Sequence, residues 1–472
     1  MMKTNRRAFL KGASAISAAS LMGVGASLAS FQAQAAQTSG YQALVCVFLL
    51  GGLDTHDTVL PYDQASYDRF ATIRASLMDQ YANMAGGSTR ARSRLLQLNP
   101  DNGADFGGRQ FALPEELSGI KALFDSGDAA IVGNVGPLIE PLNRAQWEDE
   151  TAITPKRLFS HNDQQSTWMS FQPEGSQFGW GGNFANAAVN SGANLNPEFS
   201  TITTLGHEVF LTGQNVKPYQ IGIAGAAEID ALKFFEANRS DPAGEMIYQK
   251  LRDHFEAMDF ARSNLAERDM AFAMNDALET NELFNQSLEN AQTFTTPFPN
   301  HFLGAQLKAV ATSIAARDAL MMNRQVFFVA IGGFDTHSDQ AANMPGLQQQ
   351  IDSGIVAFHQ TMQELGLGNQ VTLFTASDFG RTLAINGDGT DHGWGSHHFV
   401  IGNAVQGRQI YGQMPPYDFN HDQDSGNGRL IPTTSVEEFA APLGRWFGLN
   451  EAELAVALPN LGSFTAPPLT FV

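Results

Sequence analysis

A six-residue phrase that combines an aspartate with a histidine occurs twice in this chain. Gly51-Gly52-Leu53-Asp54-Thr55-His56 returns much later as Gly332-Gly333-Phe334-Asp335-Thr336-His337. Carboxylate oxygens and imidazole nitrogens serve as protein ligands for divalent metals, among them zinc, manganese, magnesium and calcium. The repetition therefore predicts one metal site fed by two distant parts of the chain. Its candidate ligands are Asp54, His56, Asp335 and His337.

Three further segments concentrate side chains that could bind a cation or an anion. They are Phe159-Ser160-His161, Ser377-Asp378-Phe379-Gly380-Arg381-Thr382 and Asp391-His392-Gly393-Trp394-Gly395-Ser396-His397-His398. Asp378, His392 and His397 join the candidate metal ligands, and the planar guanidinium of Arg381 could hold a phosphate, sulfate or carboxylate group. Taken singly, each histidine is also explained as a solvated side chain, and Asp378 with Arg381 as a helix cap and structural ion pair. The combination favours a site.

The apolar runs between these segments predict the strands that position them. Four short runs are typical of buried strands in a parallel sheet: residues 44–50, 129–136, 326–331 and 371–376. Between the last two, apolar residues recur at spacings of three and four from Leu347 to Leu365. This spacing predicts an amphipathic crossover helix within a right-handed βαβ unit. Because parallel strands end at one edge of their sheet, we expect the aspartates and histidines to converge there.

The mature chain is long enough for one large α/β domain, which we expect over residues 36–472. Within it, residues 228–292 alternate charged and apolar side chains at helical spacing, with almost no glycine. We interpret this segment as a helical insertion, because strand signals resume after it. The predicted fold class is α/β, with a doubly wound, mostly parallel central sheet flanked by helices.

The N-terminus carries the pattern of an export signal. Arg6-Arg7-Ala8-Phe9-Leu10-Lys11 precedes a weakly apolar stretch from Gly12 to Leu28 and the cleavage pattern Ala33-Gln34-Ala35. This order indicates a twin-arginine signal peptide over residues 1–35, so the twin-arginine export machinery is an expected partner. We expect a periplasmic or secreted protein without a membrane span in its mature chain.

Composition argues against several functions. The formal net charge is −20 and becomes −24 once the four basic residues of the signal are removed, which disfavours nucleic acid as a partner. The lone Cys46 lies in the first predicted strand, so no intrachain disulfide can form and a packed thiol is the favoured interpretation. The Asp-rich segment 418–424 lacks the spacing and terminal glutamate of an EF-hand loop, which disfavours calcium there.

The order of the motifs resembles domain-of-unknown-function family 1501, from about residue 42 to 465. The resemblance includes the motifs given above and, near the C-terminus, Arg445-Trp446-Phe447-Gly448-Leu449 and Pro459-Asn460-Leu461. That family is similar to the alkaline-phosphatase and sulfatase superfamily. The resemblance implies a central sheet flanked by helices, with a metal site at the strand ends.

The superfamily also implies roles for individual residues. The implied metal ligands are, in chain order, Asp54, Asp335, His337, Asp378 and either His392 or His397. Where the superfamily has a histidine after the penultimate aspartate, this chain has Phe379. Either His56 or His161 would replace that ligand, or a second metal is absent. Ser160, at the start of a predicted helix before His161, would be the nucleophile, so the candidate catalytic residues are Ser160, His161 and Arg381.

Two functions remain open from the sequence. The leading hypothesis is an exported, metal-dependent hydrolase that acts on a phosphate or sulfate ester of a small molecule or glycan. The alternative is a non-catalytic protein of the cell envelope that binds a metal or an anionic glycan on the same fold. The phenylalanine at position 379 favours the alternative, because it removes one expected ligand.

Overall fold

The computed structural model describes residues 40–84, 89–206, 208–256 and 264–472. The predicted signal peptide, residues 1–35, lies outside the described residues. Among the helices that are described, none is long and apolar enough to cross a membrane.

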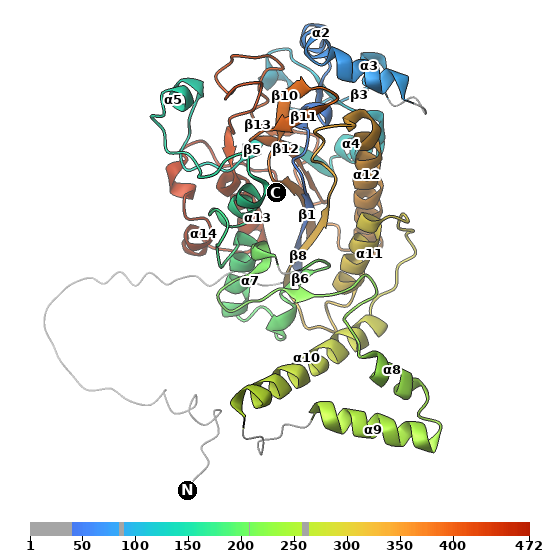
Figure 1. Cartoon of the computed structure of the whole chain (residues 1–472). Coiled ribbons are helices and arrows are strands. Elements are labelled where there is room, and N and C mark those ends of the chain that lie inside the picture. The colour runs from blue at the N-terminus through green and yellow to red at the C-terminus, as the bar shows by residue number, and fades with distance from the viewer. Residues whose placement is uncertain (1–39, 85–88, 207, 257–263) are drawn as a thin grey trace, which may run out of the picture. The chain divides into compact units, whose positions relative to one another are not determined.

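A nine-stranded sheet occupies the centre of the fold (Figure 1). Its strands are β1 (Gln42–Leu49), β5 (Ala129–Gly136), β6 (Thr201–Thr203), β7 (Tyr219–Gln220), β8 (Arg324–Ile331), β9 (Val371–Ser377), β12 (Ser396–Ile401), β13 (Ile410–Gly412) and β14 (Thr434–Ser435). Their spatial order is β13-β5-β12-β9-β1-β8-β6-β7, and β14 pairs with β5. The pairings are parallel except those of β12 with β5 and β9. The predicted mostly parallel sheet is therefore confirmed.

Strand β1 ends at the same edge of the sheet as its two neighbours. Leu49 pairs with Ile331 of β8 and with Ser377 of β9, so these three adjacent strands end at one edge of the sheet. Gly51 has a φ of +115°, and a Cβ at this position would collide with the backbone at Asp335. Glycine therefore lets the two copies of the repeated phrase lie against each other.

Alternate residues of β1 pack on opposite faces of the sheet, as the strand pleat requires. One core contains Val45 and Val47, and the other contains Cys46 and Phe48. The first face is covered by α4 (Ser118–Ser126), α11 (Phe302–Ala315) and α12 (Gln340–Glu364) (Figure 1). The second face is covered by α6 (His161–Ser170), α7 (Trp180–Asn190), α13 (Val436–Phe447) and α14 (Glu451–Ala457). The crossover helix predicted between β8 and β9 is α12.

Burial raises the pKa of the Cys46 thiol well above its ordinary value, as expected for a packed side chain.

Smaller elements complete the described chain. They are α2 (Gln64–Ile73), α3 (Ala75–Asn83), α5 (Arg144–Glu148), β2 (Leu60–Pro61), β3 (Leu96–Gln97), β4 (Phe111–Leu113), β10 (Arg381–Asn386), β11 (Gly389–His392) and the short 3-10 helices at Thr55–Asp57, Arg92–Arg94, Gly103–Phe106, Glu115–Leu117, Pro197–Phe199, Val209–Leu211 and Leu461–Ser463. Strands β10 and β11 form an antiparallel hairpin that follows β9.

Three helices occupy the segment in which a helical insertion is predicted. They are α8 (Asp230–Ala237), α9 (Pro242–Glu256) and α10 (Leu265–Glu289), and they lie between β7 and α11 in the chain. The strands on either side of them, β7 and β8, belong to the same sheet. The domain boundaries at 36 and 472 stay a prediction.

Candidate metal centre

The edge where β1, β8 and β9 end gathers side chains from four parts of the chain. Asp335 follows β8, and Asp378 directly follows β9. His161 is the first residue of α6, and His392 is the last residue of β11. The parallel strands deliver the aspartates to one edge, and the helix and the hairpin bring the histidines to them.

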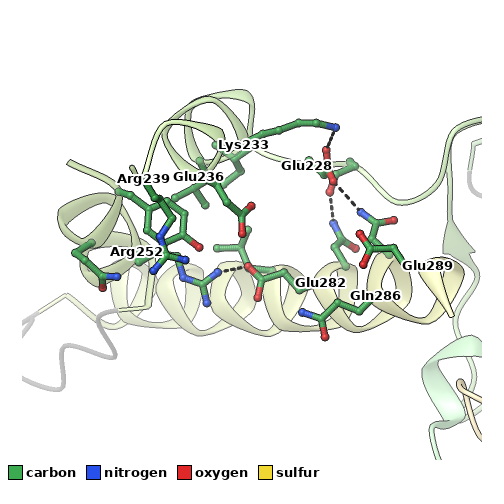
Figure 2. Close-up of a pocket in the computed structure, with 16 residues that line it drawn as sticks. Glu228, Lys233, Glu236, Arg239, Arg252, Glu282, Gln286 and Glu289 are labelled. Carbon is green, nitrogen blue, oxygen red and sulfur yellow. Dashed lines mark hydrogen bonds and ion pairs between the residues drawn. The ribbon is translucent and has the colours of Figure 1, made fainter. Parts of the chain in front are cut away.

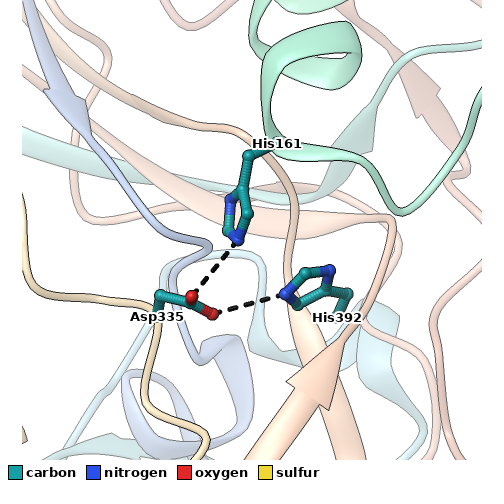
Figure 3. A group of neighbouring side chains, drawn as sticks. All are labelled: His161, Asp335 and His392. Atoms are coloured by element: carbon teal, nitrogen blue, oxygen red, sulfur yellow. Dashed lines mark ion pairs between the residues drawn. The ribbon is translucent and has the colours of Figure 1, made fainter.

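His161, Asp335 and His392 each offer an atom to one small volume. Their ligand-type atoms all lie within 4.8 Å of one another. Asp335 Oδ2 lies 3.4 Å from His161 Nε2, and Asp335 Oδ1 lies 3.3 Å from His392 Nε2. Figure 3 shows both imidazoles pointing at this carboxylate. At metal–ligand bond lengths of ~2.0–2.2 Å, two ligands of one tetrahedral ion lie roughly 3.3 Å apart, so the observed separations fit a shared cation.

His337 adjoins this group. Its Nε2 atom lies 3.1 Å from Asp335 Oδ1 and 2.9 Å from His392 Nε2. The imidazole is half-exposed, whereas His161 and His392 are about three-quarters buried, with exposed side-chain fractions of 27% and 25%. His337 is outside the group of three residues whose ligand-type atoms all lie within 4.8 Å of one another, but it places a third imidazole nitrogen beside the carboxylate.

Each of the three imidazoles has an acceptor at its Nδ1 atom. His161 Nδ1 lies 2.7 Å from Asp378 Oδ2, His392 Nδ1 lies 2.8 Å from the carbonyl oxygen of Phe159, and His337 Nδ1 lies 3.3 Å from Asp391 Oδ1. Carbonyls and carboxylates only accept hydrogen bonds, so Nδ1 of His161 and Nδ1 of His392 donate, and in the neutral form of these two rings Nε2 carries the lone pair. Metal-binding histidines are held in this way by an acceptor behind the ring.

Without a cation, the Nε2 atom of His161 is unsatisfied, because it is buried with no hydrogen-bond partner among the described residues. His337 Nε2 and His392 Nε2 lie 2.9 Å apart, where one of the two can donate a hydrogen bond to the other. A buried polar atom without a partner costs free energy, and a divalent cation would remove that cost at His161. The donor set therefore fits a divalent metal.

The carboxylate at the centre is held in its charged form. Burial opposes the charge on Asp335, but the hydrogen bond and positive charge of Arg381, together with His161 and His337, outweigh it and lower the pKa of this carboxyl. The hydrogen bond to Asp378 raises the pKa of His161, whereas burial lowers the pKa of His392. A negative carboxylate beside imidazole lone pairs attracts cations.

The structure gives Arg381 a different partner from the predicted substrate anion. Its guanidinium is fully buried, and Nη1 donates to Asp335 Oδ1 at 2.7 Å and to the carbonyl oxygen of Gly51 at 3.0 Å. Nε donates to Thr390 Oγ1 at 3.3 Å, and Nη2 donates to the Thr390 carbonyl oxygen. Since these bonds engage four of its five N–H groups, Arg381 orients Asp335 and presents no open fork.

Asp54, the counterpart of Asp335 in the repeated phrase, does not join the cluster. It is fully buried and forms a two-pronged ion pair with Arg74, at 2.6 and 3.0 Å. Gln340 Nε2 donates to the same carboxylate at 2.6 Å, and the backbone N–H of His56 donates at 3.0 Å. Because its oxygens are engaged by these donors, we leave Asp54 out of the proposed ligand set.

His56 and His397 also lie apart from the cluster. His56 is buried with Nε2 3.4 Å from the carbonyl oxygen of Gly428, and His397 is buried with Nδ1 accepting from the backbone N–H of Asn134 at 2.9 Å. Neither residue belongs to the group of potential ligands that the described residues form. Both rings are interior polar side chains, which the sequence alone could not distinguish from ligands.

Acidification is expected to destabilise the protein through His56, His397 and His398. Burial lowers the pKa of each to about 3, whereas an unfolded histidine titrates near ~6.5. Between these values the unfolded state binds protons that the folded state does not, so stability is complete above the unfolded value and falls as the pH drops below it. Each histidine should contribute a slope of ~1.4 kcal/mol per pH unit, measurable by urea unfolding at several pH values. In His398→Phe the free energy of unfolding should depend less steeply on pH than in the wild type. An unchanged pH dependence would contradict the buried, neutral state of His398.

Asp378 and Ser160 occupy positions next to the cluster. Asp378 is fully buried, and besides His161 it accepts from Gln165 Nε2 at 2.9 Å and from the backbone N–H of Gly51. It therefore supports the potential ligand His161. Ser160 immediately precedes α6, and its hydroxyl donates to Asp163 Oδ2 at 3.0 Å.

The phenylalanine in place of the expected histidine forms a wall of the site. The ring of Phe379 is buried and lies 4.8 Å from the His161 ring and 4.7 Å from the His392 ring, between centroids. His161, one of the two replacements that the sequence left open, is the one in the cluster. The supporting contacts of Phe159 and Asp391 were missed, because no spacing in the sequence connects them to distant histidines.

A pocket of about 630 Å³ lies elsewhere, among α8, α9 and α10 (Figure 2). Its charged side chains are largely paired with each other, as in Lys233 with Glu228 and Arg252 with Glu282. It contains none of the residues of the cluster. The chemistry of the side chains, and not the size of a hollow, therefore identifies the candidate site.

The fold and the cluster define an α/β protein with a potential metal centre at the carboxyl edge of its sheet. Residues 41–457 match the model of a family described as "Protein of unknown function (DUF1501)", and the chain belongs to this family. No curated protein matches it. Among solved structures, it is similar to the crystal structure of Ps i-CgsB in complex with k-i-k-neocarrahexaose, with 9% identity and a TM-score of 0.35. The crystal structure of Ps i-CgsB also matches, with 8% identity and a TM-score of 0.33, and in both cases 88% of this chain and 74% of the other are covered.

Proposed function

We propose that this protein is an exported, metal-dependent hydrolase of phosphate or sulfate esters. The observation that carries the proposal is the convergence of three imidazole Nε2 atoms on the carboxylate of Asp335, at separations of 3.4, 3.3 and 3.1 Å. The predicted signal peptide supports action in the periplasm or outside the cell. A small-molecule or glycan ester is the substrate class.

In this proposal His161, Asp335 and His392 hold the cation, and His337 lies beside them. Asp378, Asp391 and the carbonyl of Phe159 orient the imidazoles, and Arg381 orients the carboxylate. A divalent ion bound there supplies Lewis acidity, which stabilises the negative charge that develops when an ester bond breaks. The buried ring of Phe379 limits access of water from its side.

The nitrogen-rich donor set favours zinc among the metals considered. Magnesium and calcium prefer ligand sets made of oxygen, whereas imidazole suits zinc and other transition metals. Dialysis of the purified protein against zinc, manganese, magnesium or calcium, followed by elemental analysis, tests this preference. Retention of calcium or magnesium over zinc would contradict the assignment of the histidines as ligands.

A panel of phosphate and sulfate esters, offered to the metal-loaded mature protein, tests the activity. Turnover that disappears with a chelator and returns with the metal is the expected result. Stoichiometric metal without turnover across the panel would instead favour the non-catalytic, metal- or glycan-binding protein.

Ser160→Ala is expected to lower turnover by at least ~1,000-fold while metal content and fold remain unchanged. The reason is that Ser160 directly precedes His161 in the chain, at the start of α6, and carries a hydroxyl that could serve as the nucleophile. Ser126→Ala is a matched control, because the hydroxyl of Ser126 also donates to an aspartate, Asp128, at 2.8 Å. Ser126 lies just before the amino end of β5, whereas the cluster lies where β1, β8 and β9 end. Full activity in Ser160→Ala would assign the attack to water.

A further inference from the structure

We propose that Arg429 holds the anionic group of the substrate at the metal centre, a role that the sequence had given to Arg381. The ligand chemistry is that of a tetrahedral oxyanion, phosphate or sulfate. The inference rests on the proposed function for the choice of substrate, and on the contacts of Arg429 for the choice of residue.

Arg429 contacts the residue that presents a metal ligand. Its Nε atom donates to the carbonyl oxygen of His392 at 2.8 Å. Its guanidinium carbon lies 5.3 Å from the ring centroid of Phe159, whose own carbonyl accepts from His392 Nδ1. Arg429, Phe159 and His392 therefore form one contiguous group, in which the guanidinium contacts the backbone of one residue of the cluster.

The charge of Arg429 has no acidic counterpart among the described residues. Its Nε donor is engaged, but no ion pair or hydrogen bond engages its two Nη groups within the described part of the chain, and the side chain is partly exposed. The neighbouring cations differ: Arg381 is tied to Asp335, and Arg157 is tied to Asp163 at 3.1 Å. A guanidinium that lies over an aromatic ring with free Nη groups presents the planar fork that binds phosphate or sulfate through two hydrogen bonds.

The backbone around Arg429 is held in place by Asp424. The Asp424 carboxylate accepts from the backbone N–H groups of Asn420 at 2.7 Å, Gly426 at 2.8 Å and Gly428 at 2.9 Å. The carbonyl of Gly428 accepts from the N–H of Leu383 at 3.2 Å, which fastens the loop to β10. The Asp-rich segment thus uses its last aspartate to brace the loop that carries Arg429, and Asp424 is a positioning residue in this proposal.

The carboxylates around the cation position would repel an anionic substrate unless a positive charge lay nearby. Asp335, Asp378 and Asp391 surround the cation position with negative charge, which favours a cation but repels an anionic ester. Arg381 compensates Asp335 from the buried side. A second guanidinium with free donors, on the loop between β13 and β14, supplies the attraction that an oxyanion needs.

Binding of inorganic phosphate and of sulfate to the metal-loaded mature protein, measured by calorimetry, tests the inference without turnover. Arg429→Gln is expected to weaken oxyanion binding at least tenfold with unchanged metal stoichiometry, and Arg429→Lys to weaken it less, because lysine keeps the charge without the fork. Arg408→Gln is the control, because the Nε atom of Arg408 also donates to a backbone carbonyl, that of Asn99. Arg408 lies away from the cluster, since its backbone N–H donates to the carbonyl oxygen of Ala129 at the amino end of β5. This variant should leave oxyanion affinity unchanged.

The outcomes separate this inference from the proposed function. Unchanged oxyanion affinity in Arg429→Gln overturns the inference, even if the protein hydrolyses esters. Metal loss in both Arg429 variants also overturns it, because the residue would then support His392 alone. No binding of phosphate or sulfate by the wild type overturns it as well. Oxyanion binding that needs Arg429, in a protein that turns over no ester, supports the inference and contradicts the proposed hydrolase.

Discussion

Asp335→Ala is expected to remove stoichiometric divalent-metal binding and, with it, all measurable ester hydrolysis. Asp335 is the carboxylate that all three imidazoles of the centre approach, and Arg381 donates to it at 2.7 Å. Alanine would leave the three imidazoles beside an uncompensated guanidinium, whose charge repels a cation. The affinity loss should exceed a hundredfold, because replacing a mere supporting partner of a ligand already costs ~10–100-fold.

Two comparison variants make this result specific. Asp378→Asn should cost ~10–100-fold in metal affinity, since Asp378 supports His161 without facing the cation itself. Asp318→Asn should cost nothing, because Asp318 is 85% exposed and lies ahead of β8 in the chain, at the strand's other end. Elemental analysis and calorimetric titration measure all three variants. Full metal occupancy in Asp335→Ala would remove the central ligand from the proposed site.

Arg74→Met is expected to lower the free energy of unfolding by about 3–5 kcal/mol while leaving metal stoichiometry unchanged. The guanidinium of Arg74 is 1% exposed, and besides its two bonds to Asp54 it donates to the carbonyl oxygens of Thr382 and Leu383. Methionine would leave a buried carboxylate without its counter-charge and these carbonyls without a donor. Urea unfolding at neutral pH measures the loss.

The pH dependence of this ion pair follows from the direction of its pKa shift. Burial opposes the charge of Asp54, but the charge and hydrogen bonds of Arg74 outweigh it and lower the pKa of the carboxyl. The pair therefore stabilises the fold above the unfolded carboxyl pKa of ~3.9, and this contribution is lost as the pH falls through the lower folded-state value. Acidification to that range should shrink the difference between wild type and Arg74→Met.

An exposed pair provides the control for Arg74. Arg69, in α2, lies 3.7 Å from Asp418, and its side chain is 56% exposed. Arg69→Met should change stability by less than about 0.5 kcal/mol, as expected for a solvated ion pair. If Arg74→Met lost its metal while keeping its stability, Asp54 would have to be returned to the ligand set.

The strands could be predicted from local sequence. The runs at 44–50, 326–331 and 371–376 are apolar on both faces, and burial between two helical layers is the state that such runs favour. The same runs predicted where Asp335 and Asp378 emerge, because a parallel strand ends at the edge that its neighbours share. From the sequence, His161 was only one of two possible replacements for the ligand missing at position 379. Its distance from Asp335 depends on where α6 packs against the sheet.

The two copies of the repeated phrase show where local sequence stops being sufficient. Asp54 and Asp335 have nearly the same neighbours in the chain, yet Asp54 is fully buried and the side chain of Asp335 is 47% exposed. The difference comes from their partners, Arg74 for Asp54 and Arg381 for Asp335. Neither pairing has a signature at the phrase itself.

The sequence by itself determined four strands of the nine-stranded sheet, the family and the residue types available at the sheet edge, because these depend on periodicity, composition and motif order. Only the tertiary structure decided which of those residues come close enough together to be potential ligands. A metal site requires several donor atoms within a few ångströms of one point, and that coincidence depends on how α6 and the β10–β11 hairpin pack against the sheet. Such packing is set by contacts across hundreds of residues, so His56, His161 and His397 could be told apart only once the chain was folded.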